Sequence, residues 1–140
     1  MKIAIADSNE LIRLGLRVLL NTELQVTIVG EANRSCELLE LLGAFDVDVV
    51  IIDFTSSGFD INDLSQIKRN FPNVGILAVT PDQSAQVLVD ALRSGITSYV
   101  KKDCSFPEII EAVNETKNGN MFFCGQILET ISEANLDVED

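Results

Sequence analysis

The 140-residue chain contains no histidine and only three cysteines. The absence of histidine excludes Ser-His-Asp and Cys-His catalysis, most zinc chemistry and any role as a phosphohistidine carrier. The cysteines Cys36, Cys104 and Cys124 are widely spaced and include no CxxC pair. They indicate reduced thiols rather than a disulfide framework or a zinc site.

Basic residues are scarce, with 10 Lys and Arg against 22 Asp and Glu and a net charge of −12. Because phosphate binding needs clustered Lys and Arg, we do not expect this chain to bind nucleic acid itself. No apolar stretch approaches the roughly 18 residues of a membrane span. A strand pattern begins at Lys2 and leaves no room for a signal peptide. The sequence therefore predicts a cytoplasmic protein without membrane contact.

The length is that of one domain with a real core, and 46% of the residues are hydrophobic. We predict a domain over residues 1–120, followed over residues 121–140 by a short helix and an acidic linker. The last twelve residues carry five acids and no base, namely Glu129, Glu133, Asp137, Glu139 and Asp140. Such a composition is typical of a solvated linker.

Strand-like and helix-like segments alternate five times, which is typical of a parallel α/β sheet. The predicted strands are residues 2–6, 26–32, 47–53, 75–79 and 98–101. The predicted helices are residues 10–21, 35–42, 62–70, 84–94 and 105–118. A capping box over residues 105–108 supports the last helix, and Gly95 is placed to end the fourth. We predict a doubly wound, flavodoxin-like sheet of five strands in the order 2-1-3-4-5, with helices on both faces.

Polar residues stand at the carboxyl ends of four predicted strands. Asp7 follows the first strand, Asp53 ends the third, Thr80 follows the fourth and Lys102 follows the fifth. In such a sheet these ends open on one crevice, at the switch point between strands 1 and 3. Two carboxylates can hold Mg²⁺, and a carboxylate can attack phosphorus to form an acyl phosphate. Each residue alone fits an ordinary turn or surface role, but the agreement of four strand ends favours a site.

Several short segments carry a pattern that is specific in its order and spacing. They are residues 5–16, 29–32, 49–53 with Gly58, 77–80, 91–95 and 99–103. Together, over about residues 2–132, they resemble the receiver domain of bacterial two-component response regulators. The resemblance is strongest to the subfamily in which a LuxR-type helix-turn-helix follows the receiver.

The resemblance implies a role for each residue that matches the family pattern. Asp53 matches the aspartate that a histidine kinase phosphorylates. Asp7 matches one of an acidic pair that helps to hold Mg²⁺, together with Asp53 and the backbone carbonyl of Thr55. On this basis the chain is a signalling domain and not an enzyme, beyond its own phosphorylation and dephosphorylation.

Three further residues match the switch of the family. Thr80 matches the hydroxyl residue that turns toward the phosphoryl group, and Lys102 matches the lysine that pairs with that group. Tyr99 matches the aromatic whose inward rotation accompanies activation. Phosphorylation would then bias the surface formed by the fourth helix, the fifth strand and the fifth helix.

The sequence departs from the family pattern at three places. Ser8 stands where the family usually has a second acid, which should weaken Mg²⁺ binding because charge count helps to set affinity. Ser57 precedes Gly58 where proline is usual. Pro81 follows Thr80 where a small residue is usual, and it stiffens a loop that must move.

These departures leave an alternative open, namely an atypical receiver that acts as a phosphorylation-independent protein-interaction module. A third class, a flavodoxin-like enzyme or cofactor carrier, is disfavoured because residues 8–10 bring an acid where an FMN phosphate loop would lie. A cobalamin carrier would need a histidine there. Fold alone does not decide between these classes.

Two further expectations concern assembly. The first predicted helix carries Leu11, Leu14 and Val18 in addition to Leu16 and Leu20, and an exposed remainder of this apolar set would form a homodimer face. The resemblance also implies that the chain is a piece of a longer transcriptional regulator. Contact with DNA would then occur only through a C-terminal domain that is absent from this chain.

Overall fold

A sheet of five parallel strands forms the centre of the molecule, in the order β2-β1-β3-β4-β5. The computed structural model describes residues 1–133. The strands are β1 Lys2–Ala6, β2 Thr27–Ala32, β3 Val49–Ile52, β4 Gly75–Thr80 and β5 Ser98–Lys101. The helices are α1 Glu10–Glu23, α2 Ser35–Ala44, α3 Asn62–Asn70, α4 Ala85–Arg93, α5 Phe106–Lys117 and α6 Gly125–Glu133. This is the predicted fold class and strand order.

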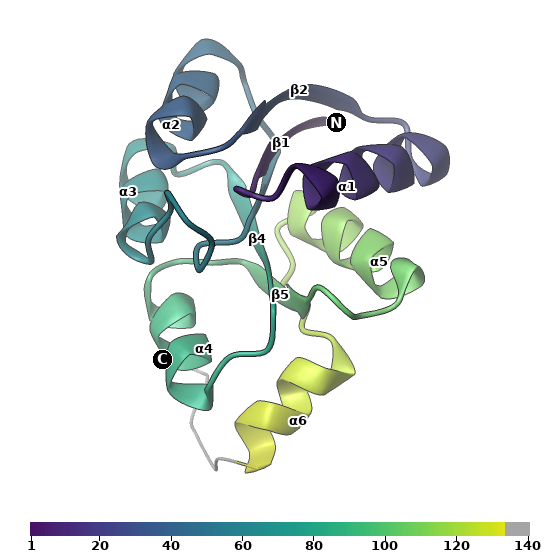
Figure 1. Cartoon of the computed structure of the whole chain (residues 1–140), viewed down its shortest axis with the longest axis vertical. Helices are drawn as coiled ribbons and strands as arrows, with labels where there is room; N and C mark the ends of the chain where they lie inside the picture. Colours follow the sequence, from purple (N-terminus) through teal and green to yellow (C-terminus); the bar gives the residue numbers. More distant parts are fainter. Residues whose placement is uncertain (134–140) are drawn as a thin grey trace.

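Helices cover both faces of the sheet, with α1 and α5 on one side and α2, α3 and α4 on the other (Figure 1). The central strand β3 is apolar and buried along its whole length, as expected for a parallel strand covered on both faces. The strand order reverses direction between β1 and β3. A crevice at the carboxyl ends of these two strands is the usual ligand site of such a sheet.

The signals that predicted the helix ends are confirmed. The Ser105 side chain accepts the backbone N–H of Glu108, and the Glu108 carboxylate accepts the backbone N–H of Ser105, with Pro107 in the first turn of α5. Gly95 directly follows the C-cap of α4 and has a φ of +105°, a conformation that favours glycine. The end of α4 and the start of α5 therefore lie where the local sequence signals predict them.

The predicted boundaries of two strands were wrong at the site. Strand β3 ends at Ile52, one residue before Asp53, because its partner β1 ends at Ala6 in the register. The Asp53 N–H still donates to the Ala6 carbonyl at 3.0 Å. Conversely, Thr80 is the last residue of β4 rather than the residue after it, since it pairs with Lys101.

A sixth helix was predicted after Gly119, and α6 confirms it. Ile127 and Ile131 are buried, and α6 packs against α4 and β5. Glu129 and Glu133 lie within α6, whereas the three remaining acids of the predicted linker lie outside the described residues, namely Asp137, Glu139 and Asp140. Over residues 1–133, none of the helices combines the length and the apolar character that a membrane span needs.

Candidate functional site

Asp53 lies at the carboxyl end of β3 with only 2% of its surface exposed. Its Oδ1 accepts the backbone N–H of Thr55 at 2.9 Å and the Thr55 hydroxyl at 2.6 Å. Its Oδ2 lies 2.7 Å from Nζ of Lys102. A buried carboxylate needs such partners, because burial without compensation is costly. The loop that follows β3 and the residue that follows β5 supply them.

Asp7 lies at the carboxyl end of the neighbouring strand β1 and is equally buried. Its Oδ1 accepts the Asn9 N–H at 2.8 Å, and its Oδ2 lies 2.8 Å from Nζ of the same Lys102. One ammonium group therefore bridges both carboxylates. Partial burial opposes the charge on Lys102, but hydrogen bonds and attraction from Asp53 and Asp7 outweigh this, so the pKa of Lys102 is raised.

The donor set fits a hard divalent cation. The Oδ2 atoms of Asp7 and Asp53 already converge on one cationic nitrogen, and carboxylate oxygens are ligands that Mg²⁺ prefers. Thr55 contacts Asp53 through its amide and hydroxyl, and the role of its carbonyl as a metal ligand stays a prediction. Ser8 contributes no carboxylate, and its N–H donates to Ser56 Oγ at 3.3 Å. The site therefore holds two acidic side chains where three would bind the ion more tightly.

Thr80, at the carboxyl end of β4, and Tyr99, within β5, form a second pair. The Thr80 hydroxyl lies 2.6 Å from the Tyr99 hydroxyl and donates to the Pro81 carbonyl at 2.8 Å, so Tyr99 is the donor to Thr80. The Tyr99 ring is 1% exposed and makes an edge contact with Phe54 at a centroid distance of 6.0 Å. Burial, with the charge of Asp53 adding to it, raises the pKa of Tyr99. The aromatic residue already lies inward.

The structure thus divides the residues that the sequence singled out into two groups. Asp7, Asp53 and Lys102 are in direct contact, while Thr80 and Tyr99 bond to each other beside them. The sequence did not point to two further participants. They are Phe54, which packs on Tyr99, and Ser56, whose hydroxyl donates to the Asp53 carbonyl at 2.9 Å.

Only one of these two residues carried a signal in the sequence. Phe54 and Ser56 lie within three residues after Asp53, in the turn that follows a buried strand. Serine in such a turn commonly bonds to nearby backbone, so Ser56 could have been identified. The edge contact of Phe54 depends on the Tyr99 rotamer and carries no sequence signal.

The chain matches the family model described as the response regulator receiver domain over residues 3–114. Among curated proteins, it is 26% identical over 129 residues to the response regulator protein VraR of Staphylococcus saprophyticus, and 26% identical to VraR of Staphylococcus aureus. These matches cover 91% of the chain but 62% of each relative. The chain therefore spans less than two thirds of the length of these relatives.

Solved structures of response regulators have the same fold. RcsB of Salmonella typhimurium superposes with a TM-score of 0.89 at 25% identity, over 96% of this chain and 67% of that one. The isolated REC domain of RcsB with the phosphomimetic BeF3⁻ gives 0.86 at 26% identity, over 94% and 98% of the two chains. A LuxR-family regulator from Aurantimonas gives 0.89 at 24% identity, over 97% and 98%, and supports the fold alone.

Proposed function

The chain belongs to the response regulator receiver domain family, and from that premise we propose that it is a phosphoacceptor whose acceptor residue is Asp53. The observation that carries the proposal is the bridge from Lys102 Nζ to Asp53 at 2.7 Å and to Asp7 at 2.8 Å. A nucleophile, a second acid and a positive charge meet there at the ligand-binding edge of the sheet.

The chemistry assigns a part to each of these side chains. An oxygen of the Asp53 carboxylate attacks the phosphorus of a phosphohistidine on a histidine kinase, forming an acyl phosphate as the P–N bond breaks. Lys102 then pairs with a phosphoryl oxygen, because its ammonium already lies against the acceptor. Asp7, Asp53 and the Thr55 carbonyl would hold Mg²⁺, which when bound offsets the negative charge of the phosphoryl group.

The switch proposed for this chain acts through the Thr80 hydroxyl. That hydroxyl bonds to Tyr99 and Pro81, and a phosphoryl group on Asp53 would compete for it. Because Tyr99 is already buried, activation would break its hydrogen bond rather than bring the ring inward. Loss of this hydrogen bond would alter the region in which α6 packs on α4 and β5.

The partners proposed for the whole protein rest on its relatives. RcsB is described bound to promoter DNA, and also as dimers bound to DNA. We propose by analogy that a histidine kinase acts on this receiver in the cytoplasm, and that a LuxR-type domain beyond this chain carries DNA binding. The receiver itself has a net charge of −12, which disfavours direct contact with phosphates. We do not propose an enzymatic role.

Intact mass measurement tests the acceptor. With a small acyl phosphate donor and Mg²⁺, the chain should gain one phosphoryl group, and Asp53→Asn should gain none. Asp48→Asn is the matched control, because Asp48 is exposed and lies just before β3, at the opposite end of that strand from Asp53. We expect this variant to be phosphorylated like the original chain. Absence of the adduct on folded protein at saturating donor would refute the proposal.

A second function, a phosphorylation-independent interaction module, is favoured by Ser8 and Pro81. Ser8 removes a carboxylate from the cation site, and Pro81 stiffens the backbone beside Thr80. Titration of Mg²⁺ followed by NMR separates the two functions. Shifts at Asp7 and Asp53 at millimolar Mg²⁺ support the phosphoacceptor, and their absence supports the interaction module.

A further inference from the structure

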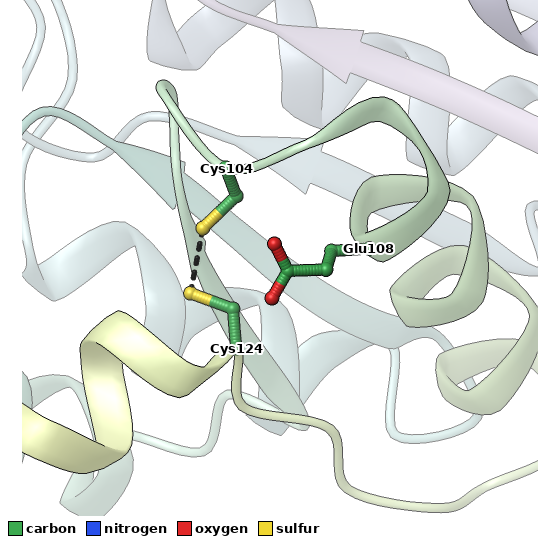
Figure 2. A group of neighbouring side chains, drawn as sticks. All are labelled: Cys104, Glu108 and Cys124. Atoms are coloured by element: carbon green, nitrogen blue, oxygen red, sulfur yellow. Dashed lines mark hydrogen bonds between the residues drawn. The ribbon is translucent and has the colours of Figure 1, made fainter.

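Cys104 and Cys124 bring two thiols together from separate elements. Cys104 lies in the turn between β5 and α5, and Cys124 directly precedes α6, 20 positions later. Both side chains are buried, with 4% and 1% exposed. The side chains point toward each other, and their Sγ atoms are 2.7 Å apart (Figure 2).

The separation of the sulfurs distinguishes two uses of such a pair. Two thiolates on one tetrahedral zinc ion lie about 3.8 Å apart, because each Zn–S bond is about 2.3 Å. A disulfide bond is about 2.05 Å long. The observed 2.7 Å is about 1 Å too short for a shared zinc ion and about 0.7 Å longer than a bond. The geometry is closer to a disulfide.

The third potential ligand at this place is already engaged. The Glu108 carboxylate lies within 4.8 Å of both sulfurs, and Figure 2 shows it beside them. Its Oε1 accepts the N–H and the hydroxyl of Ser105 and so caps α5.

We propose that Cys104 and Cys124 are a redox-active pair that forms a reversible intramolecular disulfide. A small-molecule disulfide is the oxidant. One thiol, after losing its proton, attacks a sulfur of the oxidant and releases one thiolate, which takes up that proton. The second cysteine thiol then attacks the mixed disulfide, forms the Cys104–Cys124 bond and releases the second thiol. The protein loses two hydrogens and two electrons, and the oxidant gains them.

The bond would fix α6 to the end of β5. Three hydrogen bonds join this stretch to the strand among the described residues. The Tyr99 N–H donates to the Phe122 carbonyl at 2.9 Å, and the Cys124 N–H donates to the Tyr99 carbonyl at 3.4 Å. The Phe122 N–H donates to the Ser98 hydroxyl at 3.0 Å. A covalent link two residues after Lys102 would prevent α6 from leaving the sheet. The redox state of the pair would therefore control whether α6 can leave the sheet, independently of phosphorylation.

The test uses the full chain with Cys36→Ser, because Cys36 is exposed and would form mixed disulfides of its own. After incubation with oxidised glutathione, we expect the loss of two hydrogens by intact mass and a peptide pair joined through Cys104 and Cys124. Dithiothreitol should reverse both. The bridge should raise the melting temperature by about 10 °C, since it closes a loop of about 20 residues.

The matched control carries Cys124→Ser in the same background. It should show no bridged peptides and at most one glutathione adduct, on Cys104. The proposal is overturned if the two thiols of the folded Cys36→Ser chain remain free, or if Cys104 stops at the glutathione adduct. Stoichiometric Cd²⁺ binding with a thiolate absorption band, in a chain that forms no disulfide, would assign the pair to a metal instead. If Cys124→Ser fails to fold, peptide mapping of the Cys36→Ser chain, which retains both cysteines, still shows whether the disulfide forms.

Discussion

The charge balance of the acceptor crevice depends on Lys102. Its ammonium is shared by two carboxylates that are each about 2% exposed, so the three side chains leave one excess negative charge. A divalent cation is therefore attracted, but it must compete with an ammonium that already contacts both acids. A further carboxylate at Ser8 would shift that competition toward the cation.

Replacing Ser8 with aspartate should strengthen Mg²⁺ binding by about tenfold, because a third carboxylate adds attraction in a partly buried crevice. Isothermal titration calorimetry would measure the dissociation constant. The control is Ser65→Asp, which adds the same charge at an exposed position on α3. Equal affinities in the two variants would show that Ser8 does not lie at the cation site.

Tyr99 offers a direct optical measure of the switch, since it is the only tyrosine and the chain has no tryptophan. Its raised pKa predicts that phenolate absorbance stays absent at pH 10, where a free tyrosine is half ionised. The neutral ring stabilises the fold below pH 10, and this contribution is lost as the pH rises beyond that value. The phenolate band should therefore appear together with unfolding by circular dichroism. A band that appears at pH 10 in the folded chain would contradict this.

At the level of elements, the sequence predicted those parts of the fold that depend on local pattern. The capping box at Ser105 and the apolar run of β3 each identify one element by themselves. The exact end of β3 was missed because it is set by the length of β1, a partner more than 40 residues away. Position in the chain alone could not reveal it.

The site divides in the same way. Topology alone places Asp7, Asp53 and Lys102 at one edge of the sheet, which made their meeting predictable. The hydrogen bond between Thr80 and Tyr99 depends on side-chain rotamers, and the sequence gives no rotamer. The approach of Cys124 to Cys104 depends on how α6 packs, so it too became visible only in the structure.

A close contact between β4 and α5 gives a prediction for the stability of the sheet. A Cβ added at Gly75 would lie 2.8 Å from Thr116 Cγ2 and 2.9 Å from the Thr116 carbonyl oxygen. Thr116 is buried and hydrogen-bonded to Ser98 and Ala112, so it cannot easily move. Gly75→Ala should lower the free energy of unfolding by about 1–3 kcal/mol.

The control for this substitution is Gly43→Ala. Gly43 lies within α2, and no atom comes within 4 Å of a Cβ added there. This change should raise the free energy of unfolding by about 0.5–1 kcal/mol through helix propensity. Urea denaturation of both variants measures the difference. If Gly75→Ala is as stable as the original chain, the β4–α5 contact is looser than described.

At the scale of the whole molecule, α1 leaves an apolar face uncovered. Leu11, Leu14 and Val18 follow helical spacing and are 73%, 43% and 57% exposed. Phe106, at the start of α5, is 69% exposed and lines the same groove as Leu11. A net charge of −12 opposes association of two copies, so burial of such an apolar surface must offset this repulsion if a dimer is to form. We propose that this face joins two copies of the receiver.

Leu14→Asp should therefore weaken dimer formation, because it places a charge at the centre of the apolar face. Analytical ultracentrifugation with phosphodonor and Mg²⁺ would measure the dimer fraction, with intact mass confirming equal phosphorylation. Leu128→Asp on α6 is the control, since Leu128 is 50% exposed and lies on a different helix. We expect at least a tenfold weaker dimer for Leu14→Asp, about 1.4 kcal/mol, and none of this loss for Leu128→Asp. If both variants dimerise like the original chain, the exposed leucines of α1 serve another purpose, and the dimer forms through a different surface.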